Sequence, residues 1–312
     1  MDIDLPGRIK NISLPFSKGL FPLFEAVTNS IHAIQELHRD DQGVIGIFVE
    51  RESQGTIRPE DYELRPIRSF KVEDNGIGFD EKNFKAFLTA DTTSKANMGG
   101  KGIGRFVWLK AFGRVHIDSL FFESEKFQHR VFDFVASPNG IENLQLEGSG
   151  KKDHRTSVHL LEFDQEYQAF CPKKTDVIAM RIVQHALFYF LTSACPQIVL
   201  HDEGRSVNLN EMFSERIKRF TGTGSLRIKS RDFSITHLHM YLADENRHQI
   251  HYCADNREVK KENIATYIPD LSKRLKDDEG NSFAYSSYVS VAFGVKSLFL
   301  TLLPAPGLAH SY

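Results

Sequence analysis

The spacing of apolar residues divides the first half of the chain into helical and extended segments. The three-four spacing that is typical of an amphipathic helix occurs at Leu20, Leu23, Phe24, Val27, Ile31, Ile34 and Leu37. It predicts a helix over 18–38, and shorter helices are predicted over 80–88 and 102–112. Alternating or β-branched runs predict strands at 44–51, 67–73, 114–121, 127–135, 141–147 and 155–163.

The pattern changes after residue 168. The sequence Cys-Pro-Lys-Lys at 171–174 precedes an apolar helix over 177–191 and a strand over 197–201, and strand-like runs follow at 226–229, 233–242 and 249–253. We therefore predict a first domain over 1–168 and a second α/β domain over 169–312. The apolar stretch 289–303 is expected to be either a last strand with a buried tail or a sign that the second domain is C-terminally incomplete.

Residues 71–78, Lys-Val-Glu-Asp-Asn-Gly-Ile-Gly, combine a strand end with a glycine turn. The strand delivers Asp74 into a turn that contains Gly76 and Gly78, and such glycines permit positive φ angles or a close ligand. A carboxylate in this place is suited to accept a hydrogen bond from an exocyclic amine such as that of adenine. Alone, the pattern is more typical of an ordinary turn.

The predicted helix over 18–38 carries an acid and an amide four residues apart. Glu25 and Asn29 therefore share one face of the helix. The amide oxygen can bind a hard cation such as Mg²⁺, and the carboxylate can orient and deprotonate a water. An isolated pair of this kind is more typical of a solvated helix face.

Residues 91–106 contain a polar segment and then four glycines that lead into a helix: Gly99, Gly100, Gly102 and Gly104. Backbone N–H groups at a helix start suit a phosphate, and Lys101 adds a point charge. Neither a P-loop nor a Rossmann fingerprint occurs in the chain. Further on, Thr156 lies in an alternating strand, from which it could hydrogen-bond to the ligand of Asp74.

Together these motifs resemble one superfamily. Glu25-x-x-x-Asn29, Asp74-x-Gly76-x-Gly78, the Gly99–Gly104 segment and Thr156 follow in the order seen in the GHKL ATPases. That superfamily includes gyrase B subunits, ninety-kilodalton heat-shock chaperones, histidine kinases and MutL, with MORC proteins as further relatives. The motifs lie within residues 20–161, and the glycine segment is most similar to the chaperone and MORC versions.

The resemblance implies a Bergerat-type α/β two-layer sandwich that holds ATP and Mg²⁺ between helices and a mixed sheet. Glu25 would be the general base, Asn29 the metal ligand, and Asp74 the adenine acceptor, supported by Thr156. Gly78 would let the base approach, and Gly76 would belong to the same nucleotide-binding turn. A lid around the phosphates would contain Thr93, Lys95, Gly100, Lys101, Gly102, Ile103 and Gly104. This chain has His32 where many hydrolysing members have an acidic residue, which leaves the surroundings of the metal open.

In gyrase and MutL relatives the following domain is a transducer whose lysine reaches the γ-phosphate. Lys173 and Lys174 are candidates by position, although solvated linker charges are the simpler interpretation. The apolar helix over 177–191 is either a dimer interface or, as its all-round apolarity favours, a core element.

Composition narrows the function classes. The net charge of −2 gives no overall attraction to DNA or membranes, and the three cysteines match neither a disulfide framework nor a zinc pattern. We expect the pairs His237-x-His239 and His248-x-x-His251 to lie at the surface rather than to bind metal. The sequence shows no signal peptide, and 289–303 is too short to span a bilayer, so a soluble, cytoplasmic protein is expected.

We therefore predict a Mg-dependent, ATP-hydrolysing molecular switch. The resemblance implies an ATP-dependent homodimer and a nucleic-acid or effector partner, including a DNA-linked or antiviral defence role. Two alternatives remain, a histidine-kinase-like phosphotransfer module and a nucleotide-binding scaffold without turnover. No dimerisation-helix histidine followed by an acidic residue precedes the motifs, which disfavours the kinase.

Overall fold

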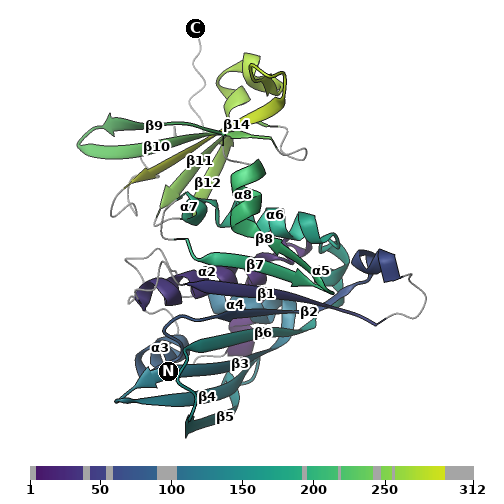
Figure 1. Ribbon diagram of the computed structural model, residues 1–312, viewed down its shortest axis with the longest axis vertical. Coiled ribbons are helices and arrows are strands. Elements are labelled where there is room, and N and C mark those ends of the chain that lie inside the picture. Colours follow the sequence, from purple (N-terminus) through teal and green to yellow (C-terminus); the bar gives the residue numbers. More distant parts are fainter. Residues whose placement is uncertain are drawn as a thin grey trace. The chain divides into compact units, whose positions relative to one another are not determined.

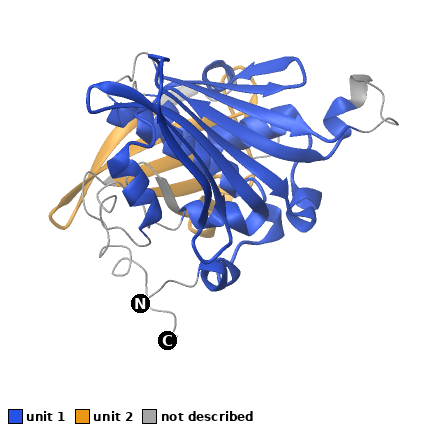
Figure 2. Cartoon of the chain, turned by 90° about the horizontal axis from the view of Figure 1, so that it is seen from below, with its two compact units in different colours: residues 1–96, 100–215 blue, residues 97–99, 216–312 orange. Residues whose placement is uncertain are grey.

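A computed structural model describes residues 5–37, 43–53, 59–89, 104–191, 195–216, 219–241, 247–254 and 257–291. Within them the chain forms two compact units that divide at residues 215 and 216 (Figure 2). Unit 1 contains all the described residues before this division, and unit 2 contains those after it.

Unit 1 is built on an eight-stranded mixed sheet (Figure 1). The strands are β1 Val44–Arg51, β2 Ile67–Asp74, β3 Phe112–Glu123, β4 Lys126–Val135, β5 Ile141–Gly148, β6 Arg155–Phe163, β7 Gln197–Asp202 and β8 Arg205–Asn208. Their order is β5-β4-β3-β6-β2-β1-β7-β8, and only the β1–β7 pair is parallel among these neighbours. The strands predicted in the first half are thus confirmed, with β2, β3, β4 and β5 slightly longer than expected.

Helices cover one face of this sheet. They are α1 Leu5–Lys10, α2 Phe21–Glu36, α3 Glu81–Leu88, α4 Gly104–Ala111, α5 Gln165–Phe170, α6 Thr175–His185, α7 Leu187–Phe190 and α8 Leu209–Arg216, with 3-10 turns η1 Phe16–Lys18 and η2 Pro59–Leu64. α2 lies on β1 and β2 and contacts α4. Its first turn contains Pro22, which favours a helix start, while Asp80 caps α3 through the Asn83 N–H at 2.7 Å.

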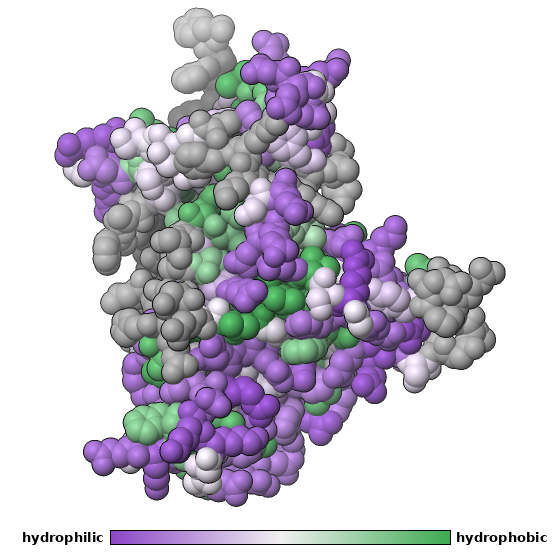
Figure 3. All heavy atoms as spheres, in the orientation of Figure 1, coloured by the Kyte–Doolittle hydropathy of each residue, from purple (hydrophilic) through white to green (hydrophobic). Residues whose placement is uncertain are grey.

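The alternation of each strand separates core from solvent. Ile45, Ile47 and Val72 point toward the helices and are fully buried. On the opposite face of the sheet, Lys71 on β2 and His116 on β3 point away from the helices and are partly exposed. The surface over β3, β4 and β5 is accordingly mostly hydrophilic in the view of Figure 3. This arrangement confirms the α/β fold with a mixed sheet and one helical layer.

The domain boundary predicted near residue 168 differs from the observed division. β7 pairs in parallel with β1 from Val44 and Gln197 onward, and β8 pairs with β7, so both strands belong to the first sheet. The Cys-Pro-Lys-Lys break is a connection inside unit 1, where the Lys173 carbonyl accepts a hydrogen bond from Arg51 at 2.6 Å. A local break in the pattern marked a turn here and not the end of a folding unit.

The helix predicted over 177–191 is divided into α6 and α7 at Ala186, which has φ −92° and ψ 12°. α6 is amphipathic: Ile178 and Ile182 are buried, whereas Arg181 and His185 are exposed. The core-element interpretation therefore holds for one side of the helix only.

Unit 2 contains a sheet of order β12-β11-β14-β10-β9, with β13 paired to β14. Its elements are β9 Arg219–Ile228, β10 Arg231–Met240, β11 Gln249–Ala254, β12 Arg257–Asn263, η4 Ile264–Thr266, η5 Pro269–Ser272, β13 Leu275–Lys276 and β14 Ser282–Val291. No α-helix occurs between 219 and 291 in the part that is described, so the α/β character predicted for this region is wrong there. β14 overlaps the stretch predicted as a last strand, 289–303, only at 289–291, and residues 292–312 lie outside the described residues.

Of the histidines predicted to lie at the surface, His237 and His239 are partly exposed, whereas His248 and His251 are buried. His248 is fully buried, its Nε2 donates to the Lys273 carbonyl at 2.7 Å, and its Nδ1 accepts from the Tyr285 N–H at 2.7 Å. His251 is also buried and stacks on Tyr288. Among the described residues no three metal-binding side chains cluster. Likewise, no described helix is long and apolar enough to cross a membrane.

Candidate nucleotide site

Asp74, the last residue of β2, is held between α2 and the turn that follows the strand. Its Oδ2 accepts from Ser30 Oγ at 2.7 Å, and its Oδ1 accepts from the Gly76 N–H at 2.9 Å. The turn itself rests on α2, because the Ile77 N–H donates to the Ala33 carbonyl at 3.0 Å. A Cβ on Gly76 would lie 2.6 Å from the Ala33 carbonyl carbon, so only glycine permits this approach.

The Asp74 carboxyl is unusual because it is buried without a described cation beside it. Only 5% of the residue is exposed. Burial raises the pKa of Asp74 to about 6, although the hydrogen bonds from Ser30 and Gly76 lower it in part. The carboxyl is therefore close to its own titration near neutral pH, and any further hydrogen-bond donor would favour the ionised form.

Gly78 and Thr156 lie beside this carboxyl. Thr156 on β6 is the direct cross-strand neighbour of Asp74, and both are buried. Gly78 has φ +78°, and a Cβ there would lie 2.8 Å from Ser119 Oγ and 3.3 Å from Thr156 Oγ1. Both glycine positions in the motif are thus required by close contacts, one against the helix and one against the sheet.

Two serines that the sequence analysis missed complete this end of the site. Ser30 follows Asn29 on α2 and orients Asp74. Ser119 on β3 lies opposite Thr156, with 2.9 Å between their hydroxyl oxygens, and accepts from the Phe79 N–H at 3.0 Å. Ser119 could have been suspected as a polar residue at an inward position of an apolar strand, whereas Ser30 carried no comparable signal.

The side chain of Glu25, on α2, lies against the first residue of α4. Its carboxylate occupies the space that a Cβ on Gly104 would need, so the two residues are in direct contact. The N-terminus of a helix carries partial positive charge, which favours a carboxylate there. Of the glycines in the predicted lid, Gly104 is the one that lies within the described residues. Through its contact with Glu25, the start of α4 packs against α2.

Asn29 is half-buried on the same face of α2 as Glu25. Its carboxamide has no hydrogen-bond partner among the residues that the structure describes. An amide oxygen in this position fits a Mg²⁺ ion, which takes one or two protein oxygens and completes its shell with phosphate and water.

The remaining lid residues lie outside the described part of the chain: Thr93, Lys95, Gly100, Lys101, Gly102 and Ile103. The structure therefore places Glu25, Asn29, Asp74, Gly76, Gly78, Gly104 and Thr156 around α2 and the end of β2. Lys173 and Lys174 are exposed in the connection before α6.

His32 is buried and makes a hydrogen bond to α7. Its Nε2 lies 2.7 Å from the Tyr189 hydroxyl on α7. The position three residues after Asn29 is therefore connected to α7 and does not present a carboxylate.

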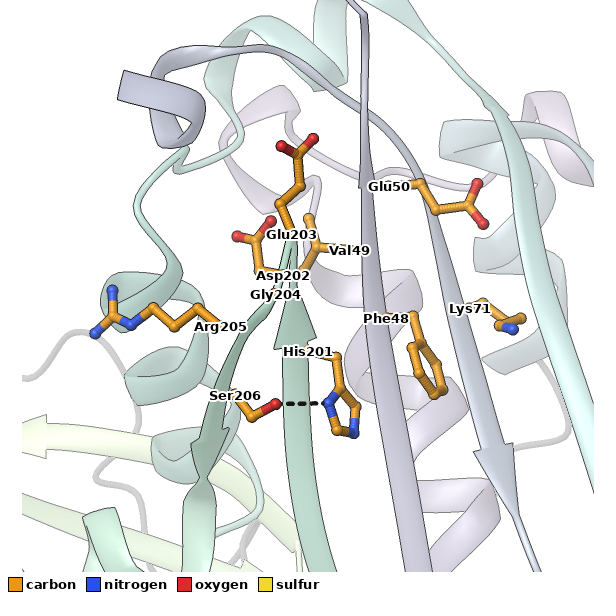
Figure 4. Close-up of a pocket in the computed structure, with 10 residues that line it drawn as sticks. All are labelled: Phe48, Val49, Glu50, Lys71, His201, Asp202, Glu203, Gly204, Arg205 and Ser206. Atoms are coloured by element: carbon orange, nitrogen blue, oxygen red, sulfur yellow. Dashed lines mark hydrogen bonds between the residues drawn. The ribbon is translucent and has the colours of Figure 1, made fainter. Parts of the chain in front are cut away.

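A separate cavity of about 330 Å³ lies on the other side of the sheet (Figure 4). Its lining residues are Phe48, Val49, Glu50, Lys71, His201, Asp202, Glu203, Gly204, Arg205 and Ser206. The His201 ring stacks on Phe48 at 4.8 Å and bonds to Ser206 at 2.9 Å. Every charged lining residue already has a partner of opposite charge, for example Lys71 with Glu73 at 3.0 Å. The cavity therefore offers no unmatched charge to a ligand.

The similarity to known proteins is distant. No protein-family model matches the sequence, and no curated protein matches it. The ATPase region of Saccharomyces cerevisiae topoisomerase II aligns at 13% identity and a TM-score of 0.46, over 87% of this chain and 73% of that chain. The same region bound to ICRF-187 (dexrazoxane) aligns with equal values. A likeness at this level assigns no activity, so the functional proposal rests on the residues of this chain.

Proposed function

We propose that this protein binds ATP with Mg²⁺ and hydrolyses it, and that it acts as a molecular switch. The observation that carries the proposal is the buried carboxyl of Asp74, which has no cation beside it among the described residues and is held by Ser30 and the Gly76 N–H at 2.7 and 2.9 Å. A buried carboxylate without a counter-charge is costly to the fold, which favours a role in binding.

Asp74 would select adenine. Its remaining acceptor capacity suits the exocyclic amine of adenine, whereas guanine has a carbonyl oxygen at the same position and would repel the carboxylate. Gly78 leaves room for the base, and Thr156 would add a hydroxyl beside Asp74. ATP and ADP should therefore bind, and GTP should bind poorly.

The opposite end of the site would act on the phosphates. The Asn29 amide oxygen would ligate Mg²⁺, and the Glu25 carboxylate would take the proton of the attacking water. The metal, when bound, would neutralise charge on the phosphates. We assign the lid residues Thr93, Lys95, Gly100, Lys101, Gly102, Ile103 and Gly104 to the phosphates by the resemblance alone.

A non-hydrolysing scaffold is the second candidate. It is favoured by His32, because the chain lacks an acid where many hydrolysing relatives have one. An ATP-dependent homodimer and a nucleic-acid or effector partner in a DNA-linked or antiviral system are proposed from the resemblance, without a residue that carries them.

Glu25→Ala separates the enzyme from the scaffold. A positioned base contributes about 10²–10⁴-fold to rate. We expect turnover, measured as phosphate release, to fall at least about a hundredfold, with ATP affinity nearly unchanged. Binding can be followed by the fluorescence of Trp108, the only tryptophan, which is buried in α4.

Glu36→Ala is the matched control, because Glu36 lies on the same helix but pairs with Lys82 at 2.6 Å. It should turn over ATP like the wild type. Equal rates for Glu25→Ala and wild type would remove Glu25 as the base. A wild-type protein that binds ATP but releases no phosphate would establish the scaffold.

A further inference from the structure

The face of α2 that carries Glu25 and Asn29 is flanked by two contacts with α6 and α7. Phe24, next to Glu25, stacks on His185 at the end of α6, with 4.6 Å between ring centroids and an interplanar angle of 18°. His32, three residues after Asn29, meets Tyr189 on α7, with 2.7 Å between Nε2 and the hydroxyl oxygen. Along the helix, one contact thus lies before the proposed base, Glu25, and the other after the proposed metal ligand, Asn29.

The His32–Tyr189 contact is the more specific of the two. Both residues are buried, with 8% and 2% exposed. A buried hydrogen bond between side chains requires a defined distance and angle, so it favours one arrangement of its two elements. The rings also meet edge to face at 5.8 Å and 64°.

The other side of α2 is fixed independently. There the Ala33 carbonyl accepts from Ile77, and Ser30 bonds Asp74. These bonds hold the adenine end of the site without a contribution from α7. The contacts of His32 and Phe24 with α7 and α6 act instead on the part of α2 that carries Glu25 and Asn29. Misplacement by about 1 Å can lower a catalysed rate about a hundredfold.

We propose that Tyr189, through its hydrogen bond to His32, is a positioning residue for Asn29 and Glu25. This inference rests on the proposed function. It makes α7 the support for the phosphate end of the site, in place of the acidic residue found in many relatives.

Tyr189→Phe tests the proposal because it removes the hydroxyl and keeps the ring. We expect kcat for ATP to fall about tenfold, with ADP affinity within about twofold of wild type, since a single buried hydrogen bond is lost far from Asp74. His32→Leu should show the same loss, and the double variant should lose no more than either single variant. His32→Gln, whose amide can still bond Tyr189, should retain most of the activity.

Tyr167→Phe is the matched control. Tyr167 is equally buried, and its hydroxyl donates to the Leu14 carbonyl at 2.8 Å, in the segment before α2 and not to a residue of that helix. It should lower the unfolding temperature to a similar degree and leave kcat unchanged. Wild-type kcat in Tyr189→Phe, or additive losses in the double variant, would overturn the inference and leave the ATPase intact.

A second readout applies if the wild type binds nucleotide without turnover. The ratio of ADP affinity with Mg²⁺ to that in EDTA reports Asn29 directly, and it should decrease in Tyr189→Phe and not in Tyr167→Phe. An unchanged ratio would overturn the inference. A wild type that binds no nucleotide at all would remove the proposed function and the inference together.

Discussion

Two buried aspartates end the strands that flank β1, and their surroundings are opposite. Asp202, at the end of β7, accepts from Arg51 Nε at 2.9 Å and from its Nη2 at 2.6 Å, and also from Thr175. Both side chains of this ion pair are fully buried. Asp74, at the end of β2, has a serine hydroxyl and a backbone N–H but no cation among the described residues.

The difference in surroundings indicates a structural role for Asp202 and a binding role for Asp74. Arg51 also donates to the carbonyls of Glu63, Arg65 and Lys173. The Arg51–Asp202 ion pair therefore holds β1, β7 and the connection before α6 together. Such a pair is internally complete and leaves nothing for a ligand. Asp74 carries a desolvation cost that no positive charge in the described part of the chain offsets, as expected for a group whose partner is a ligand.

Asp202→Asn should have the largest effect, and it should act on stability. It leaves the buried Arg51 guanidinium without its counter-charge, which typically costs about 3–5 kcal/mol in the free energy of unfolding. Urea denaturation followed by circular dichroism measures this loss. ATP affinity per folded molecule should stay the same. A stable Asp202→Asn variant that no longer binds ATP would show that Asp202 acts in binding and not only in the stability of the fold.

Asp74→Asn should act on binding instead. The side-chain amide would place a donor against the adenine amine, and a lost hydrogen bond to a charged group costs about 1.5–3 kcal/mol, or about tenfold to a hundredfold in affinity. Titration calorimetry with ATP and GTP measures both the loss and the selectivity. Wild-type ATP affinity in this variant, or equal ATP and GTP binding by the wild type, would refute the adenine assignment.

Much of unit 1 could be predicted because its signals are local. The apolar spacing of α2 and the alternation of β1 and β6 reflect one covered face, and Gly76 and Gly78 mark a turn that tolerates no Cβ. These features placed Glu25, Asn29 and Asp74 on the elements where the structure has them.

The remainder depends on contacts between distant segments. Ser30 and Asp74 are 44 residues apart, and Arg51 and Asp202 are 151 apart, so no local pattern pairs them. The parallel addition of β7 to β1 moved the unit boundary for the same reason. In unit 2, β12 reads Arg-Glu-Val-Lys-Lys-Glu-Asn, too polar to be recognised as a strand.

The pH dependence of ATP affinity tests the role of the Asp74 carboxyl. The pKa of its carboxyl is raised from 3.8 to about 6 by burial. The ionised form is needed as acceptor, so ATP affinity should fall as the pH is lowered through 6, by up to about tenfold per unit below it. Calorimetry at pH 5.0, 6.0 and 7.5 measures this. Constant affinity across the series would show that Asp74 stays ionised or does not contact the base.

Stability should show the opposite trend. Because the folded pKa is raised, the stability contribution of the protonated form is complete below 3.8 and is lost as the pH rises through about 6. A shift of about two units corresponds to about 3 kcal/mol. Asp74→Asn should therefore become more stable than wild type, by an increasing margin, between pH 4 and pH 7. A margin that stays constant would argue against the raised pKa.

Ser30→Ala should have the smallest effect and act through Asp74. It removes the hydroxyl that donates to Asp74 Oδ2 and favours the ionised carboxyl, so the pKa should rise further and ATP affinity at pH 7.5 should fall about threefold to tenfold. The loss should be larger at pH 6. Ser69→Ala is the matched control, since Ser69 is fully buried and donates to Glu50 on the open side of the sheet. It should leave ATP affinity unchanged at both pH values. If the two serine variants bind ATP equally well, the hydroxyl of Ser30 supports the fold and does not tune Asp74.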